Sequence, residues 1–260
     1  MQYPDEGELF RTRITANDKN VAQSRPLIFF AHHFRGHKKA LKRHIELMNA
    51  LGFDAYAFNL KDSLKEHQYV PYSHISKKFG LKHALADQIE EHLNLLTAYK
   101  TKIIFAFSNV AGCAIEAVAR RSTRDVIALI CDSGPGAAFV YSSYKLIEQQ
   151  MRVNFLPLKI IGTPLVMFSW SGEFHRDIPK DLQKFPEGFP ILSIRGWKDK
   201  LISPGHIDKI FEPAQNINWR KLALPEAGHL TGLRDFPDEY RAGLEDFLLS
   251  LTNEGVFAPS

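Results

Sequence analysis

The fold of this chain is decided by residues 103–119, which read IIFAFSNVAGCAIEAVA. The first five residues form an uninterrupted apolar run, which is typical of a strand buried on both faces of a sheet. The small residues from Val110 to Ala119 predict a helix. Ser108 falls on the turn between the two elements. A buried strand followed at once by a helix is the repeating unit of a parallel α/β sheet.

The same alternation of strand and helix recurs on both sides of this stretch. Apolar residues at helical spacing over 38–51 and 82–99 predict two amphipathic helices. The segment from Glu8 to Thr15 alternates and predicts an antiparallel edge strand. Further apolar runs predict strands at residues 27–31, 54–58, 126–131, 190–194 and 219–224. The sequence therefore predicts an α/β fold with a mostly parallel central sheet and helices on both faces.

Residues 137–189 interrupt this alternation. The segment is rich in aromatic and aliphatic residues and shows no clean succession of strand and helix. An apolar insertion after a sheet strand predicts a cap over a site at the carboxyl edge of the sheet. The alternative is an excursion that completes the core. We expect residues 1–136 and 190–260 to form the core and residues 137–189 to form the cap.

The composition is that of an ordinary globular protein. The chain has 260 residues, of which 45% are hydrophobic and 24% are charged, and this length suits one large α/β domain. Lys and Arg number 33 against 29 Asp and Glu, which gives a formal net charge of +4. The basic residues are scattered along the chain, so we expect solvated helix faces and no nucleic-acid partner.

Cysteine usage and hydropathy suggest a compartment. Cys113 and Cys131 lie inside apolar segments and form no CxxC pattern, so we expect buried free thiols in a reducing environment. The N-terminus lacks the apolar run of a secretory signal. No stretch reaches the roughly 18 apolar residues that a membrane-spanning helix needs. We therefore expect a cytoplasmic protein without a transmembrane segment.

Three polar residues, each after a different predicted strand, could form one catalytic site: Ser108, Asp199 and His229. The carboxyl ends of parallel strands meet at one edge of a sheet, where ligands bind. A serine on a sharp turn from strand to helix presents its hydroxyl to the cleft, and the first amides of the helix can donate to an oxyanion. The simpler alternatives are an N-cap serine, an exposed turn aspartate and an exposed loop histidine.

In this order the three residues resemble the catalytic triad of the α/β-hydrolase superfamily, in which a serine, an acid and a histidine follow successive strands. The resemblance extends from about Glu8 to Leu251. It implies that Ser108 is the nucleophile, His229 the base and Asp199 the acid that orients the base.

Two further segments enter the same resemblance. Residues 31–37, which read AHHFRGH, resemble the oxyanion loop of the superfamily. By position, the resemblance implies that the backbone N–H groups of Phe34 and Asn109 form the oxyanion hole. Asp132, at the end of its predicted strand, is a competing candidate for the acid, although a turn or cap role is its simpler interpretation.

The chain departs from the superfamily pattern at three positions. The turn around the serine usually reads Gly-x-Ser-x-Gly, whereas Ala106 and Val110 stand at the two glycine positions here. His33 stands in the oxyanion loop where a glycine is expected. Side chains crowd a tight turn, so these departures motivate a second hypothesis, although the retention of all three triad residue types favours the enzyme. Under it, the protein is a non-catalytic ligand-binding or scaffold protein that retains the fold.

The resemblance implies a serine hydrolase that cleaves carboxylic esters or thioesters of an apolar acyl group through an acyl-serine intermediate. We expect a small-molecule substrate and no cofactor. We also expect no metal, because the clustered His32, His33 and His37 have no nearby carboxylate or cysteine at metal-binding spacing. The oligomeric state stays open. The residues expected to line the substrate pocket are His33, Phe107, Phe139, Phe168 and Trp170.

Overall fold

A computed structural model describes residues 3–13, 25–61, 70–150, 152–173 and 175–253. Its centre is a seven-stranded sheet in the order β1-β3-β2-β4-β5-β6-β7, in which β1 is antiparallel to β3 and every other pair is parallel. The strands are β1 Glu8–Phe10, β2 Leu27–Ala31, β3 Ala55–Ala57, β4 Lys102–Phe107, β5 Val126–Asp132, β6 Phe189–Gly196 and β7 Ile217–Leu224. The predicted mostly parallel sheet is confirmed.

The edge strand is shorter than predicted. Pairing between β1 and β3 ends at Phe10, opposite Ala55. The backbone N–H of Thr12 instead donates to the Asp54 side chain at 2.8 Å, and the Thr12 hydroxyl donates to the carbonyl oxygen of Asn49 at 2.7 Å. These two bonds draw the chain away from the sheet edge. Residues 14–15 of the predicted strand lie outside the described residues.

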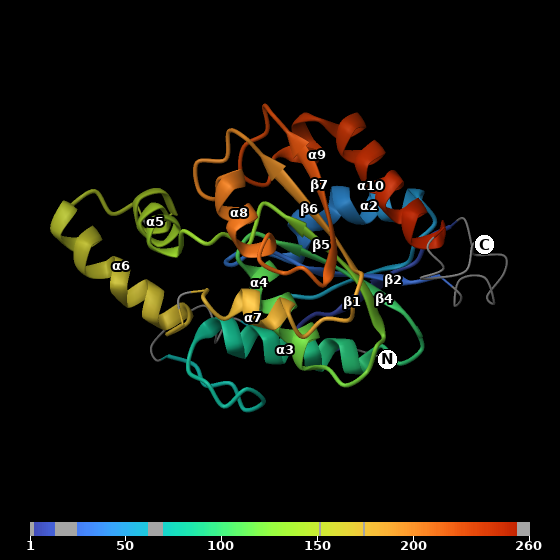
Figure 1. The fold of residues 1–260 in the computed structure, drawn as a ribbon, viewed down its shortest axis with the longest axis horizontal. Helices are drawn as coiled ribbons and strands as arrows, with labels where there is room; N and C mark the ends of the chain where they lie inside the picture. Colours follow the sequence, from blue (N-terminus) through green and yellow to red (C-terminus); the bar gives the residue numbers. More distant parts are fainter. Residues whose placement is uncertain (1–2, 14–24, 62–69, 151, 174, 254–260) are drawn as a thin grey trace.

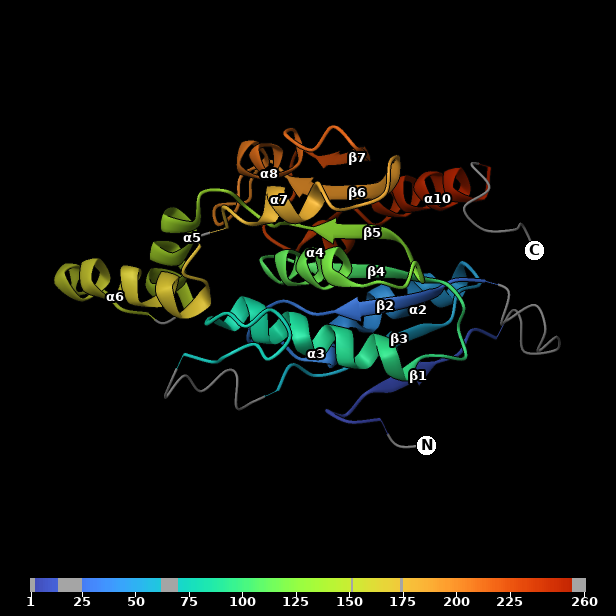
Figure 2. The same ribbon diagram turned by 60° about the horizontal axis from the view of Figure 1, so that its bottom comes forward.

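Helices cover both faces of the sheet, as predicted (Figures 1 and 2). One face carries α3, α4, α7 and α8, and the other carries α2 and α10. The predicted helix over 38–51 is divided into a 3₁₀ turn, η1, and the α-helix α2. The helices are η1 Lys38–Leu41, α2 Lys42–Ala50, α3 Leu81–Leu95, α4 Val110–Arg120, α5 Phe139–Lys145, η3 Leu146–Gln150, α6 Leu156–Trp170, α7 Ile178–Leu182, α8 Pro204–Phe211, α9 Gly232–Asp235 and α10 Pro237–Asn253.

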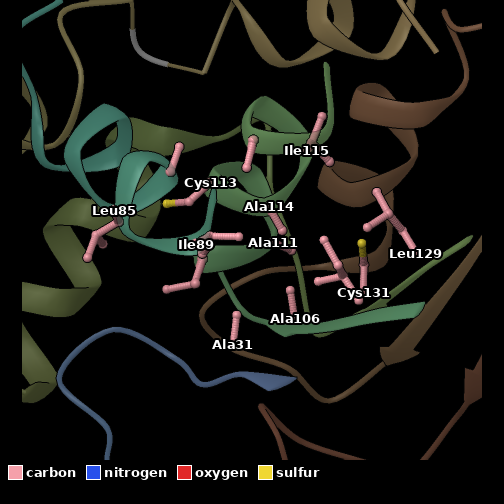
Figure 3. Packing of buried hydrophobic residues seen from close by; sticks show 14 of the residues in the cluster. Ala31, Leu85, Ile89, Ala106, Ala111, Cys113, Ala114, Ile115, Leu129 and Cys131 are labelled. Carbon is pink, nitrogen blue, oxygen red and sulfur yellow. The ribbon is translucent and has the colours of Figure 1, made fainter. Parts of the chain in front are cut away.

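Small side chains bring α4 close to the centre of the sheet (Figure 3). Ala111 and Ala114 of α4 lie in one fully buried cluster with Ala31 of β2 and Ala106 of β4. The predicted thiols are also there, since Cys113 and the strand residue Cys131 are both free and buried. Close packing at this point fixes the position of the turn that joins β4 to α4.

The segment 137–189 divides into two parts in space. Helices α5 and α6 project away from the sheet, at the left of Figure 1. In contrast, α7 packs against α4, and its Ile178 and Leu182 are fully buried in the core. Among the described helices, none is long and apolar enough to cross a membrane.

Candidate active site

Ser108 occupies a strained turn at the end of β4. Its backbone φ is +55°, in the left-handed region that non-glycine residues rarely adopt. Its N–H donates to the carbonyl oxygen of Asp132 at 2.8 Å, which anchors the turn to the neighbouring strand. Asn109, not Ser108, is the N-cap residue of α4. Ser108 therefore does not serve as the N-cap of α4, and its hydroxyl is available to other groups.

A glycine beside the turn, and not within it, allows this geometry. The two positions where the superfamily pattern has glycine hold Ala106 and Val110, which are both fully buried. Gly134, in the loop after β5, packs directly on the turn. A Cβ at position 134 would lie 2.5 Å from the carbonyl oxygen of Ser108, which real Cβ atoms essentially never do. The close approach of the loop after β5 to the backbone of Ser108 is thus possible because residue 134 has no side chain.

The structure brings Ser108, His229 and Asp199 together. The Oγ of Ser108 lies 3.1 Å from Nε2 of His229, and Nδ1 of His229 lies 2.7 Å from Oδ2 of Asp199. Hydrogen-bond partners assign the tautomer: Nδ1–H donates to the carboxylate, which leaves Nε2 to accept from the serine. The three residues follow β4, β6 and β7, so three parallel strands place them at one edge of the sheet.

Asp199 is buried and held by backbone, so it is not the exposed turn aspartate of the simpler alternative. Its Oδ1 accepts from the N–H groups of Leu201 and Ile202, each at 2.8 Å. Its Oδ2 is thereby aimed at His229. Gly196, at the end of β6, lets the two loops meet, because a Cβ there would lie 2.2 Å from the carbonyl oxygen of Ala227.

Asp132, the competing acid candidate, makes no hydrogen bond to His229 in the described structure. Its Oδ1 accepts from the Ser133 hydroxyl at 2.7 Å, and its Oδ2 accepts from the Tyr240 hydroxyl at 2.6 Å. Burial raises the pKa of the Asp132 carboxyl. The N–H of Leu230 donates to Oγ of Ser133 at 3.1 Å, so Asp132 reaches the loop of His229 indirectly. Sequence reasoning missed Ser133 and Tyr240, because neither stands in a recognisable motif.

The predicted oxyanion loop is braced by His32. The N–H of Leu60 donates to its Nε2 at 3.1 Å, so its Nδ1 carries the proton and donates to the carbonyl oxygen of His33 at 2.8 Å. The ring of His33 packs on Gly36, where a Cβ would lie 2.7 Å from the ring. Burial, with a smaller effect of the nearby His229, lowers the pKa of His33. His33 therefore lines the site as a neutral side chain at neutral pH.

A cavity of about 350 Å³ opens on Ser108 and His229. Of the predicted pocket residues, His33, Phe139 and Trp170 line it, and so do Phe34 and Asn109. Sequence reasoning missed the remaining lining residues, most of which come from the α5–α6 segment and from the loops after β6 and β7: Arg35, Leu81, Ser142, Ser143, Leu146, Leu165, Val166, Ser169, Leu201 and Leu230.

Two predicted pocket residues lie elsewhere. Phe107 belongs to the cluster on the other face of the sheet and packs on His44, with ring centroids 4.8 Å apart. Successive side chains of a strand alternate between faces, so Phe107 is directed away from the cavity. Phe168 is 58% exposed and lines a separate groove between α5 and α6. Neither residue lines the cavity beside Ser108.

No family model matches the sequence, and no curated protein matches it. Solved structures do match over nearly the whole chain. An esterase of Pyrococcus furiosus, Pf2001, is 14% identical with a TM-score of 0.61 and coverage of 87% of this chain and 82% of its own. Est1E of Butyrivibrio proteoclasticus, solved with ferulic acid, is 15% identical with a TM-score of 0.64 and 94% coverage of both chains. The chain has the α/β-hydrolase fold. A hydrolase of Pseudomonas aeruginosa, 15% identical, matches with a TM-score of 0.58 over 95% of this chain and 97% of its own.

Within the α/β-hydrolase fold, a second polar cluster lies between α3, α4 and α7. Two groups of ligand atoms there are close enough to hold a metal ion: His83, Glu173 and Asp177, and Glu116, Asp177 and Asp181. The fully buried Nζ of Lys82 already lies among them, 3.1 Å from Glu116 and bonded to Asp177. The lysine supplies the positive charge that an ion would bring, so these residues do not fit a metal site.

Proposed function

We propose that the protein is a serine hydrolase that cleaves carboxylic esters or thioesters of an apolar acyl group through an acyl-serine intermediate. One observation carries the proposal. The hydroxyl of Ser108, on a left-handed turn, is 3.1 Å from a histidine whose other nitrogen is 2.7 Å from the buried Asp199. A serine in contact with a base that is oriented by an acid is the arrangement of an activated nucleophile.

The geometry supports acyl transfer in two steps. Nε2 of His229 accepts the proton of Ser108 as Oγ attacks the substrate carbonyl, and the carbonyl π-electrons move onto its oxygen. The tetrahedral intermediate collapses, the imidazolium of His229 protonates the leaving alcohol or thiol, and the acyl-serine ester remains. Water then repeats the sequence and releases the acid. Asp199 holds the imidazole and stabilises its charged form.

We assign the oxyanion hole to the backbone N–H groups of Phe34 and Asn109. Both residues line the cavity beside Ser108. Asn109 immediately precedes α4, where the helix dipole favours a negative charge. The bond from His32 to the carbonyl of His33 holds the loop that carries Phe34.

The cavity favours an apolar acyl group of modest size. Its volume of about 350 Å³ is near the lower end of the range for small-molecule sites. Aliphatic and aromatic side chains supply most of its wall, including Phe139 and Trp170. We propose that residues 137–189 act as a cap on the core of residues 1–136 and 190–260, with α5 and α6 covering the pocket. The names of the structural neighbours, two esterases and a hydrolase, agree with this class of reaction.

Labelling with a fluorophosphonate tests the proposal. Ser143 lines the same cavity, and its hydroxyl has no hydrogen-bond partner among the described residues, so Ser143→Ala is a matched control for Ser108→Ala. We expect intact mass to show one adduct on the wild type and on Ser143→Ala, and none on Ser108→Ala. Hydrolysis of p-nitrophenyl esters should fall by roughly 10³-fold or more in Ser108→Ala and in His229→Ala.

The same experiment decides the alternative hypothesis of a non-catalytic ligand-binding or scaffold protein. That hypothesis expects no adduct on folded wild type, together with ligand binding that is unchanged by Ser108→Ala. Such a result would mean that the side chains of Ala106 and Val110 keep Ser108 from reacting with the fluorophosphonate.

A further inference from the structure

Helix α6 exposes an almost wholly apolar surface. We call this surface the outer face of α6, and its residues are between 56% and 64% exposed: Leu156, Leu158, Ile160, Ile161, Leu165 and Phe168. Large aliphatic and aromatic side chains rarely gather on the solvent side of a helix that is covered by nothing. The outer face therefore indicates a partner.

Two of the three polar residues of α6, Lys159 and Thr163, lie on its buried side, together with Met167 and Trp170. A surface helix usually exposes its polar residues. The buried positions of α6 recur every three or four residues. The ammonium of Lys159 donates to Glu148 at 2.8 Å, and the Thr163 hydroxyl donates to the carbonyl oxygen of Lys159 at 2.7 Å. The two buried polar side chains are thus satisfied within the protein, while six large apolar side chains of the same helix are exposed.

The segment that carries the outer face has more basic than acidic residues. Residues 137–172 contain three basic residues, Lys145, Arg152 and Lys159, and a single acidic residue, Glu148. Both carboxylate oxygens of Glu148 accept from lysines, Lys145 at 2.6 Å and Lys159 at 2.8 Å. Arg152 is exposed just before α6. The segment therefore combines an apolar surface with a net charge of 3 − 1 = +2.

A groove beside the outer face shares lining residues with the cavity that holds Ser108. The groove, of about 1040 Å³, runs between α5 and α6 and is lined almost entirely by apolar side chains. Phe139 and Leu165 line both this groove and the cavity that holds Ser108. Helices α5 and α6 project from the sheet and the helices that cover it (Figures 1 and 2).

We propose that the outer face of α6 binds the surface of an anionic lipid bilayer. Basic charge beside an apolar helix face is the combination that holds a helix in the plane of the headgroups. At roughly 22 Å, a helix of 15 residues is too short to cross the hydrocarbon core and suits this orientation. Pairing of two copies through the same face would bring two segments of charge +2 together, so a lipid surface is the better match.

Vesicle binding tests this inference without any catalytic assay, so its outcome is independent of the proposed function. Ile161 on α6 and Leu249 on α10 are equally exposed at 63%, which makes Leu249→Glu a matched control for Ile161→Glu. With vesicles of phosphatidylcholine and phosphatidylserine, we expect Ile161→Glu to weaken binding at least about tenfold and Leu249→Glu to leave it unchanged. Leu158→Glu, a second variant on the same face, should behave like Ile161→Glu.

The charge is tested separately. Arg152→Gln should weaken binding to the anionic vesicles about fivefold and change little on phosphatidylcholine alone. Absence of vesicle binding by the wild type would overturn the inference, as would equal losses in Ile161→Glu and Leu249→Glu.

Sedimentation velocity tests the competing possibility that the outer face binds a second copy of the chain. A wild-type dimer that Ile161→Glu converts to a monomer, with no binding to vesicles, would assign the outer face to a second copy and reject the lipid surface.

Discussion

The backbone N–H of Leu230 donates to Oγ of Ser133 at 3.1 Å, and this bond joins the loop of His229 to the end of β5. Ser133 donates its own hydroxyl proton to Asp132, so its lone pairs are directed toward Leu230. The carbonyl oxygen of Asp132 also accepts from the N–H of Ser108. Asp132 therefore bonds to the turn of the proposed nucleophile, and the adjacent Ser133 bonds to the loop of the proposed base.

Ser133→Ala should lower kcat about tenfold and leave KM nearly unchanged. One net hydrogen bond is worth about 1 kcal/mol, and its loss lets the loop of His229 move relative to Ser108. Ester hydrolysis under saturating substrate gives the measurement. Ser250→Ala serves as the control, because it removes a serine hydroxyl that donates to the carbonyl oxygen of Phe247 at 2.7 Å on α10, far from the site. A folded Ser133→Ala protein with wild-type kcat would show that this bond does not position the base.

Tyr240→Phe and Tyr99→Phe should have similar effects on stability but different effects on activity. Each tyrosine donates to a buried aspartate at 2.6 Å, Tyr240 to Asp132 and Tyr99 to Asp54. Loss of either bond should lower the free energy of unfolding by about 1–3 kcal/mol, as measured by urea denaturation. Only Tyr240→Phe should also lower kcat, because Asp132 holds Ser133. Equal activities of the two variants would contradict this difference.

Gly134→Ala should disrupt the turn of Ser108. The new Cβ would meet backbone atoms of Ser108 at 2.5 Å and 2.6 Å, and neither can move without shifting β4. We expect weak expression, or a folded protein with little labelling by the fluorophosphonate. Gly205→Ala is the control, since a Cβ there meets nothing within 4 Å and alanine favours the helix. Normal labelling of Gly134→Ala would mean that the turn tolerates a wider spacing than the structure has.

Much of the fold could be predicted from the sequence because buried parallel strands are continuous apolar runs. The stretch 103–107 is an example. The runs that predicted β6 and β7 likewise end shortly before Asp199 and His229, as the strands themselves do. Chain order at the carboxyl edge then brought the three candidate residues together. Their catalytic roles stay a proposal.

What could not be predicted depends on which way a side chain points. Phe107 and Ser108 are adjacent in sequence, yet Phe107 packs on the face of the sheet that carries α2 and α10, whereas Ser108 lines the cavity. Phe168 and Trp170 are two residues apart on α6, yet only Trp170 reaches the cavity, because the rotation of a projecting helix is set by tertiary contacts. Gly134 stood out in no motif, since its role arises from a neighbouring strand.

His175 should make the protein less stable in mild acid. The indole N–H of Trp170 donates to its Nε2 at 2.8 Å, and its Nδ1 donates to the carbonyl oxygen of Gly136 at 2.9 Å. The neutral ring thus links α6 to the loop after β5. Burial lowers the pKa of His175 to about 4, and the charges of Lys82 and Asp177 act on it with opposite signs.

The direction of the pH effect follows from proton binding. Between pH 6.5 and about 4 the unfolded chain binds a proton at His175 and the folded chain does not, so acid favours unfolding in that window. The contribution is about 1.4 kcal/mol for each pH unit below 6.5. His175→Gln removes it, although the loss of both bonds should destabilise the variant at pH 7. Urea denaturation at pH 7 and pH 5 should therefore show a gap between wild type and variant that narrows in acid. A gap that is constant with pH would mean that His175 has the same pKa in the folded and the unfolded chain, which would contradict the lowered pKa.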